Sequence, residues 1–288
     1  MKNLLLIDAN SLIHRCYHAL PPFTAPDGKP TGALYGLASI LIKIAKERKP
    51  DYIAAFFDRP EPTFREVEFP EYKIHRPPTP DPLISQIIES HNLFLAFKIK
   101  TFEIPGFEAD DLIGTAATKI QVQADIRIGI LSGDSDLLQL VHDDNVEVEI
   151  LQKGISETKT YNARAVREKF GVAPEQLPEY KGLVGDPSDN IPGASGVGPK
   201  GAQKVIQAYG TIERFLKEGM GEKLFKKIAP QKERVILSRR LSTIRRDAPL
   251  EIQINELKLC EFDEEIISYF REMGFKSLVD RVQNKTLF

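Results

Sequence analysis

Two short acidic clusters are the residues of this sequence best suited to chemistry. They are Glu108-Ala109-Asp110-Asp111 and Asp134-Ser135-Asp136. Carboxylates that lie close together repel one another unless a cation stands among them, and proteins hold Mg²⁺ through carboxylate oxygens. The clusters therefore predict a divalent-metal site. For either cluster alone a second interpretation is equally strong, because acidic residues are also favoured in the first turn of a helix.

The strands that precede these acids decide between the two interpretations. Apolar runs at 3–7, 52–57 and 126–131 predict buried strands, and each is followed by an aspartate: Asp8, Asp58 and Asp134. Glu108 follows a shorter predicted strand at 98–104. Helices are predicted at 31–49, 83–95, 112–124 and from 137, and an outer strand at 146–151. This alternation predicts a mostly parallel α/β sheet, whose strand ends would deliver all four acids to one rim. Helix capping does not explain that convergence.

Residues 59–82 form a long predicted excursion from the sheet. Seven prolines argue against a helix interior, and basic residues alternate with aromatics: Arg59, Phe64, Arg65, Phe69, Tyr72, Lys73 and Arg76. Long loops in compact domains are commonly lids or binding loops, and this composition suits a nucleic-acid strand, since bases stack on rings and phosphates pair with cations. The alternative is a solvated loop.

The character of the sequence changes after about Phe170. The Gly/Pro-rich turn 185–193 adds Asp186 and Asp189, and Gly196-Val197-Gly198-Pro199-Lys200 opens a predicted helix that ends near Tyr209. Free backbone N–H groups at such a helix start suit a phosphate. Residues 221–246 hold nine Lys/Arg against two Glu, which would strengthen binding to a phosphate backbone. The alternative for this basic region is a solvated helical face.

Composition sets the broad class of the protein. With 288 residues, 42% hydrophobic content and a net charge of -2, the chain is long enough for one large domain or two smaller ones. Cys16 and Cys260 give neither a disulfide framework nor zinc spacing. The N-terminal apolar run is too short for a signal peptide, and no run approaches a membrane span. We therefore expect a cytoplasmic protein.

These residues together resemble one family over essentially the whole chain, the bacterial and phage 5′→3′ exonucleases of the flap endonuclease family, which also form the N-terminal domain of DNA polymerase I. The motifs that carry the resemblance are Asp8-Ala9-Asn10, Phe57-Asp58, Tyr72-Lys73-Ile74-His75-Arg76-Pro77-Pro78, Gly106-Phe107-Glu108-Ala109-Asp110-Asp111, Asp134-Ser135-Asp136 and Gly185-Asp186 through Asp189-Asn190-Ile191-Pro192-Gly193. The resemblance implies a PIN-like (resolvase-like) catalytic domain over 1–172, with flanking helices and a helical arch at about 60–95. It also implies a helical C-terminal region over 173–288, with a helix-three-turn-helix (helix-hairpin-helix) motif at about 184–216.

The resemblance also implies roles for individual residues. Two Mg²⁺ (or Mn²⁺) ions would be held by nine acids, of which Asp8, Asp58, Glu108 and Asp110 or Asp111 lie toward one metal and Asp134, Asp136, Asp186 and Asp189 toward the other. Lys73 and Arg76 would act at the scissile phosphate, and Tyr72 would stack there. Duplex DNA would contact the hairpin residues Gly196, Val197, Gly198 and Lys200, where relatives also hold K⁺.

The implied activity is hydrolysis of DNA phosphodiesters by a 5′→3′ exonuclease and 5′-flap endonuclease, in replication and repair, including RNA-primer processing. Its partner would be DNA with a 5′ flap, a nick or a free 5′ end, and we expect a monomer without a membrane partner. The Met1 start favours a free-standing enzyme over the front of a polymerase. Two alternatives stay open: a PIN-type ribonuclease, and a noncatalytic module that binds branched DNA.

Overall fold

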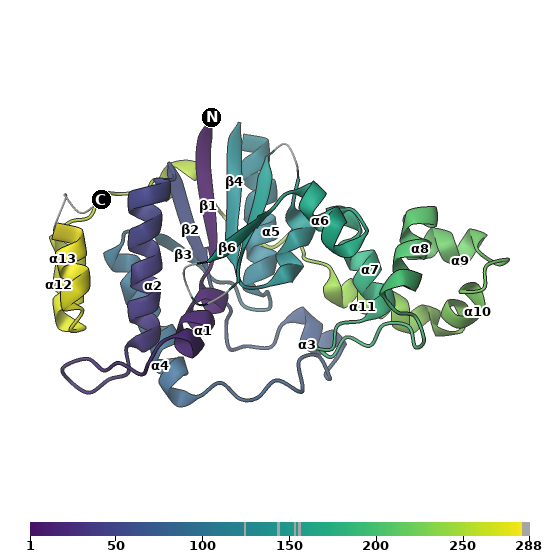
Figure 1. Ribbon diagram of the computed structural model, residues 1–288, viewed down its shortest axis with the longest axis horizontal. Coiled ribbons are helices and arrows are strands. Elements are labelled where there is room, and N and C mark those ends of the chain that lie inside the picture. Colours follow the sequence, from purple (N-terminus) through teal and green to yellow (C-terminus); the bar gives the residue numbers. More distant parts are fainter. Residues whose placement is uncertain (124, 143–144, 153, 155–156, 284–288) are drawn as a thin grey trace.

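A six-stranded sheet forms the centre of the computed structural model, which describes residues 1–123, 125–142, 145–152, 154 and 157–283 (Figure 1). The strand order is β3-β2-β1-β4-β5-β6. The strands are β1 (Lys2–Asp8), β2 (Tyr52–Phe56), β3 (Lys100–Phe102), β4 (Ile126–Ser132), β5 (Val146–Leu151) and β6 (Thr158–Tyr161). All pairs are parallel except β5 with β6, which is antiparallel. The predicted mostly parallel α/β sheet is confirmed.

Alternate side chains of the central strands enter two cores, one on each face of the sheet. Leu4 and Leu6 of β1 pack in one core, and Leu5 and Ile7 pack in the other. Burial on both faces explains the uninterrupted apolar runs of these strands. The strand predicted at 146–151 is β5, and one further strand, β6, lies outside it at the edge of the sheet. Three of the four β6 residues are exposed and polar, so β6 has no apolar pattern.

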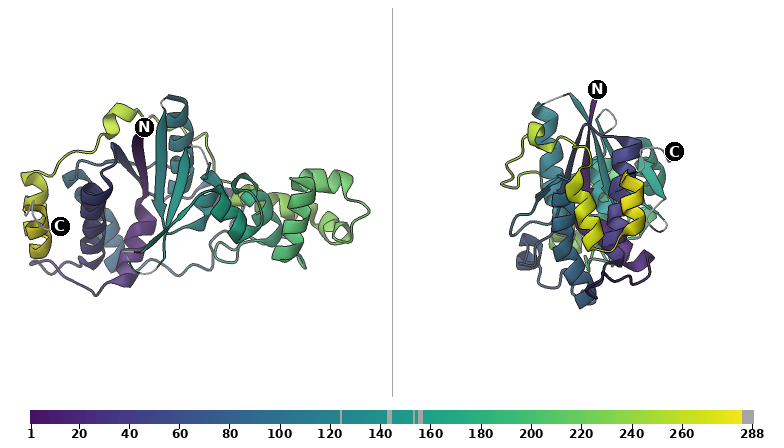
Figure 2. Two further views of the ribbon diagram at one scale, coloured as in Figure 1. Left: turned by 45° about the horizontal axis from the view of Figure 1, so that its top comes forward. Right: turned by 90° about the vertical axis from the view of Figure 1, so that its left-hand side faces the viewer.

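Helices cover both faces of the sheet (Figures 1 and 2). One core contains residues of α1 (Ala9–Ala19), α2 (Gly32–Lys43) and α4 (Asp81–Ala96), and the other contains residues of α5 (Ala109–Gln123). The chain continues α2 as a π-helical turn, Ile44–Arg48, and stops it with Lys49 in the left-handed region before Pro50. Both α1 and α5 begin directly after acidic residues of the rim.

The excursion between β2 and α4 crosses the carboxyl ends of the strands. Its helical part is α3 (Phe64–Glu68), and residues 69–80 run through turns and extended backbone before α4 begins. The expected helical arch at 60–95 is therefore helical at its two ends. Pro70, Pro77, Pro78 and Pro80 account for the difference, because proline interrupts a helix interior. We call residues 59–80 the arch segment below.

The C-terminal half occupies both ends of the molecule (Figures 1 and 2). Beyond β6 come α6 (Ala163–Phe170), α7 (Leu177–Val184), α8 (Pro199–Tyr209), α9 (Ile212–Glu218), α10 (Phe225–Ile228) and α11 (Lys232–Ser242). The last helices, α12 (Glu264–Glu272) and α13 (Lys276–Gln283), lie at the opposite end, where they contact α4 and α2. The helices of the expected C-terminal region, 173–288, thus lie in two places, at opposite ends of the molecule.

Candidate active site

Asp8 and Asp58 fix the rim at the ends of two neighbouring strands. Asp8 is buried and caps α1, accepting hydrogen bonds from the Ser11 N–H at 3.0 Å and from the Ser132 hydroxyl at 2.6 Å. Asp58 accepts one from the Ala109 N–H, at 2.7 Å, at the start of α5. These contacts tie β1, β2, β4 and α5 together at one edge, so the aspartates cap helices as well as line the rim.

A cavity of about 280 Å³ opens at this rim. Five of the nine predicted metal acids line it: Asp8, Asp58, Glu108, Asp110 and Asp134. A small adjoining hollow shares three of these acids and adds Asp136 and Asp189. Lys73, Arg76 and His14 also line the cavity. The acids that reach this place come from four strand ends and from the turn after α7.

Asp111 is turned away from the cavity. Its side chain is fully buried and accepts two hydrogen bonds from Arg65, at 2.7 and 2.9 Å, and one from the Arg245 N–H at 2.8 Å. Asp111 lines neither hollow. Of the two alternatives expected to lie toward one metal, Asp110 or Asp111, Asp110 is the one that lines the cavity. Because Asp110 and Asp111 are neighbours on a helix, their side chains point in different directions.

Arg65, named above among the basic residues of the predicted binding loop, has a structural role. It is 3% exposed, although it lies in the arch segment. Besides Asp111, it donates hydrogen bonds to the carbonyls of Leu241, at 2.8 Å, and Thr243, at 3.0 Å. Arg65 thus joins the arch segment, the start of α5 and the end of α11. In the sequence it resembles the other cations of a proline-rich binding loop.

Lys181 on α7 has no sequence signal of its own. Its ammonium group lies between two predicted metal acids: it pairs with Asp136 and, at 2.7 Å, with Asp186. All three side chains are at most 16% exposed. Burial lowers the pKa of Lys181, but the two carboxylates outweigh burial and raise it above the ordinary value. The group therefore stays charged.

The turn 185–193 delivers Asp186 and Asp189 to the rim. Asp186 and Ile191 exchange two backbone hydrogen bonds of 2.8 Å, which close the turn. Gly185 and Gly193 both have positive φ, and a Cβ on Gly193 would stand 2.3 Å from the Gly185 nitrogen. Only glycine fits such an approach, so the Gly/Pro composition of this segment has a steric reason.

The arch segment packs against the acids of the rim through Lys73 and Arg76. Lys73 donates a hydrogen bond to Glu108 at 2.8 Å, and Arg76 donates one to Asp189 at 2.5 Å. The backbone N–H of Lys73 also donates to the Asp189 carbonyl, at 3.0 Å. Both predicted arch cations are thus at the rim, where each pairs with a carboxylate.

Tyr72 differs from its expected role. Its side chain is 5% exposed, packs with Ile191 and Leu241, and directs its hydroxyl to Glu108 and Asp189 at 3.3 and 3.2 Å. A ring in this position has no free face for stacking on a base. In the arrangement seen, Tyr72 anchors the arch segment to the turn 185–193.

The electrostatics of the rim reflect a surplus of negative charge. Burial, followed by repulsion from Asp58, raises the pKa of Asp8 to about 7. Burial and the charge of Asp134 likewise raise the pKa of Asp136 to about 7 and hold that of Asp110 well above its usual range. The pKa of Glu108 is lowered, because Lys73 and Arg65 outweigh its burial.

The donor set fits a hard divalent cation. It consists of carboxylates, which Mg²⁺ prefers, and burial together with repulsion from neighbouring aspartates raises the pKa values of Asp8 and Asp136. Within the described ranges, three or more acidic, His or Cys side chains nowhere converge closely enough to hold an ion. Several of the acids are instead paired with Lys73, Arg76 and Lys181. These pairs would have to open for a metal to bind.

We expect metal binding to release protons. The carboxyls of Asp8 and Asp136, with pKa values of about 7, are partly protonated at pH 6.5 without metal, whereas a bound metal requires the ionised form. Affinity for Mg²⁺ should therefore rise as pH increases through about 7. Calorimetric titration at pH 6.5 in two buffers of different ionisation enthalpy counts the protons. Equal heats in both buffers would contradict the expectation, and Asp136→Asn should reduce the count.

The predicted hairpin lies at the start of α8. Val197 is buried in the core shared with α5, whereas Gly196, Gly198 and Lys200 are exposed. Gly198 is the N-cap of α8, and the exposed Lys227 donates a hydrogen bond to the Gly196 carbonyl at 3.3 Å. The exposed backbone around Gly198 can therefore approach a ligand closely.

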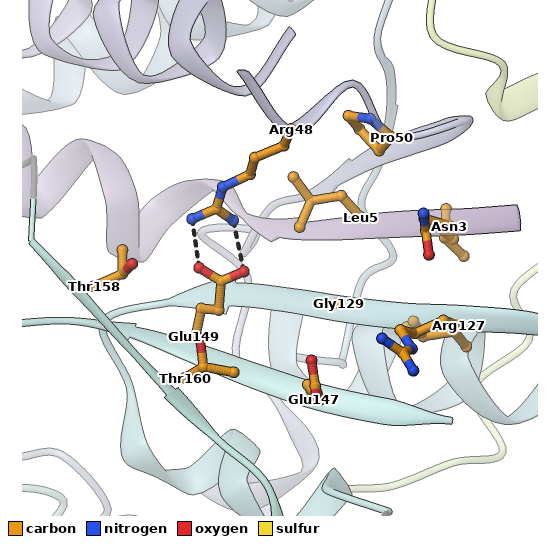
Figure 3. Close-up of a pocket in the computed structure, with 12 residues that line it drawn as sticks. Asn3, Leu5, Arg48, Pro50, Arg127, Gly129, Glu147, Glu149, Thr158 and Thr160 are labelled. Atoms are coloured by element: carbon orange, nitrogen blue, oxygen red, sulfur yellow. Dashed lines mark hydrogen bonds and ion pairs between the residues drawn. The ribbon is translucent and has the colours of Figure 1, made fainter. Parts of the chain in front are cut away.

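A larger hollow, of about 500 Å³, opens over β1, β4, β5 and β6 near the start of β1 (Figure 3). Arg48 and Glu149 form a bidentate ion pair over it. The hollow is also lined by Arg127, Glu147, Thr158 and Thr160. None of the predicted site residues lines this hollow. Its charges are mixed and partly paired, so it lacks the concentrated charge of the rim.

Comparison with known proteins gives the family of the chain. Residues 3–171 match the model for the N-terminal resolvase-like domain of 5′-3′ exonucleases, and residues 172–265 match the model for their C-terminal SAM fold. The chain is 39% identical to a DNA polymerase I of Bacillus caldotenax over 98% of its own length, which is 32% of that relative. It is 36% identical to a 5′-3′ exonuclease of Aquifex aeolicus, covering 98% of the chain and 96% of the relative.

Solved structures agree on the fold. The zinc-bound T5 5′-exonuclease superimposes with a TM-score of 0.70 at 20% identity, covering 98% of both chains. Among the described residues, no helix is long and apolar enough to cross a membrane. The chain spans about a third of the polymerase relatives and nearly the whole of the Aquifex exonuclease. On these matches, the chain belongs to the 5′-3′ exonuclease family of resolvase-like nucleases.

Proposed function

We propose that this chain is a divalent-metal-dependent 5′→3′ exodeoxyribonuclease and 5′-flap endonuclease of DNA replication and repair. The observation that supports it most is the convergence of acids from separate strand ends on one cavity, with Lys73 and Arg76 reaching the same place from the arch segment. The substrate class is taken from the family and from the exposed hairpin. The Aquifex relative that the chain matches end to end is itself named a 5′-3′ exonuclease.

The chemistry follows from the donor set. When bound, a pair of Mg²⁺ (or Mn²⁺) ions supplies a hydroxide and stabilises the attacking and leaving oxygens of an in-line displacement at phosphorus. Asp8, Asp58, Glu108 and Asp110 would hold one ion, and Asp134, Asp136, Asp186 and Asp189 the other. Asp111, the ninth expected acid, is left out of this scheme, because Arg65 donates hydrogen bonds to both Asp111 oxygens.

Lys73 and Arg76 would act on the phosphate itself. Both pair with carboxylates of the rim in this structure. Once those carboxylates bind metal, the two cations are free to contact the scissile phosphate and offset the charge that develops there. No covalent nucleophile is required, and the product would carry a 5′-phosphate.

Duplex DNA would lie along the helical end of the molecule. The hairpin at 196–200 offers backbone N–H groups, and exposed cations follow just before α10 and on α10 and α11: Lys223, Lys226, Lys227, Lys232 and Arg234. Such cations bind phosphates without reading sequence. A K⁺ ion at the hairpin carbonyls is part of this proposal. Free thiols at Cys16 and Cys260 and a DNA substrate suit the cytoplasm.

One experiment separates this function from its rivals. The chain is incubated with a 5′-flap duplex, a nicked duplex and a single-stranded RNA of the same sequence, with Mg²⁺ or with excess chelator, and product ends are identified. We expect cleavage of both duplexes near the 5′ end, 5′-phosphate products and no cleavage in chelator. Preferred cleavage of the RNA would instead support a PIN-type ribonuclease. Binding without cleavage would support a noncatalytic module.

A further inference from the structure

We propose that Lys181 takes the place of the metal ion between Asp136 and Asp186 when that ion is absent. Its positive charge holds the two carboxylates together and weakens the binding of a metal ion there. When these carboxylates bind metal, the Lys181 ammonium contacts an anionic oxygen of the DNA. This inference rests on the proposed function, because it assumes that Asp136 and Asp186 are metal ligands.

Geometry provides the first argument. The Lys181 ammonium lies within 2.7 Å of an Asp186 oxygen and also pairs with Asp136. The two aspartates come from different parts of the chain, η2 (Ser135–Leu140) and the turn after α7, and the lysine lies on α7, five residues before Asp186. One cation therefore bridges two acids that are 50 residues apart in sequence, as a metal ion would.

Charge provides the second argument. When both aspartates are ionised, two carboxylates and one ammonium leave a net charge of -1 at this place, and a second cation must overcome repulsion from the lysine. The other rim lysine differs, since Lys73 contacts a single carboxylate, Glu108. Lys181 is 12% exposed, so its charge is poorly screened by solvent. When it loses both partners, this buried charge needs a new anion, and the phosphate backbone of DNA supplies one.

The first test measures cation binding without DNA, using Mn²⁺ and the electron paramagnetic resonance signal of the free ion. The weaker of the two Mn²⁺-binding sites should bind Mn²⁺ about tenfold more tightly in Lys181→Met than in the wild type, because a nearby positive charge has been removed. Lys204→Met is the matched control: it removes an exposed lysine paired with Glu222 and should leave the Mn²⁺ affinity of both sites unchanged. Unchanged or weaker Mn²⁺ binding by Lys181→Met would overturn the proposal.

Stability gives an independent measurement. Without metal, Lys181→Met leaves two partly buried carboxylates without their cation, so its melting temperature should fall, and Mn²⁺ should raise it by more than in the wild type. A merely structural lysine would give the fall without the larger metal response. Should Lys181→Met fail to fold, Lys181→Gln keeps a hydrogen-bond donor and removes the charge, and the same tighter Mn²⁺ binding is required of it.

The DNA step has its own measurement. If Lys181 contacts a phosphate in the metal-bound enzyme, the slope of log(kcat/KM) against log salt should become shallower by about one in Lys181→Met. An unchanged slope would refute that step. Mn²⁺ binding is measured without turnover, so cleavage that persists in chelator would defeat the proposed function and leave the binding result standing. Unchanged Mn²⁺ affinity would instead defeat only the role of Lys181.

Discussion

Asp110→Asn is expected to lower the cleavage rate on a 5′-flap duplex by about 10³-fold or more, which corresponds to about 4 kcal/mol of transition-state stabilisation. Asp110 lines both the main cavity and the adjoining hollow, so it stands where the two groups of acids meet. Asparagine has nearly the same shape but removes a charged oxygen ligand. Single-turnover rates at saturating Mg²⁺ measure the loss.

Two further measurements show whether this loss reflects metal binding. The pKa of Asp110 is raised by burial and by the charges of Asp134 and Asp8, so removing its charge should not destabilise the metal-free protein. DNA affinity in chelator should be equal or higher, because less negative charge faces the phosphates. Asp27→Asn, an exposed aspartate paired with Lys29, is the control and should cleave normally. A rate for Asp110→Asn within a few-fold of wild type would contradict the assignment.

The rim itself could be predicted from sequence, for a physical reason. A buried parallel strand has a distinctive apolar run, its carboxyl end is fixed by the fold, and an acid placed there has a known position. The apolar runs therefore predict that Asp8, Asp58 and Asp134 lie at the rim, where all three line the cavity. The turn 185–193 is equally evident from the sequence, because Gly185 and Gly193 are required where two stretches of its backbone approach each other closely.

The partners of the acids could not be predicted in this way. Arg65 lies 46 residues from Asp111 and Lys181 lies 45 residues from Asp136, so the sequence does not show that these pairs meet. Lys181 is only five residues from Asp186, but nothing in its neighbourhood distinguishes it from a surface cation. The same limit explains Tyr72, which reads as a stacking residue in a basic loop but is buried because the loop folds onto the rim. Side-chain direction also separates Asp110 from Asp111, a distinction that residue type alone does not carry.

Arg65→Met is expected to destabilise the protein by about 3–5 kcal/mol, because it leaves the buried Asp111 carboxylate without its cation. Arg65 and Asp111 are 3% and 0% exposed, and their two hydrogen bonds are 2.7 and 2.9 Å long. Urea unfolding followed by circular dichroism measures the change. Arg59→Met removes an arginine whose ion pairs with Glu61 and Glu103 are exposed, so it should change stability little.

A double-mutant cycle then tests whether Asp111 is a partner of Arg65 or a ligand of a metal. Arg65→Met with Asp111→Leu removes both charges, so its destabilisation should be clearly smaller than the sum of the two single changes. The variants that fold should still bind the wild-type number of Mn²⁺ ions, because Asp111 lines neither hollow of the rim. Additive destabilisation would contradict the pairing of Asp111 with Arg65. The loss of one bound ion in Asp111→Leu would show that Asp111 is a metal ligand. Cleavage should fall in the two variants that lack Arg65, because Arg65 also holds the arch segment to the end of α11 and thereby positions Lys73.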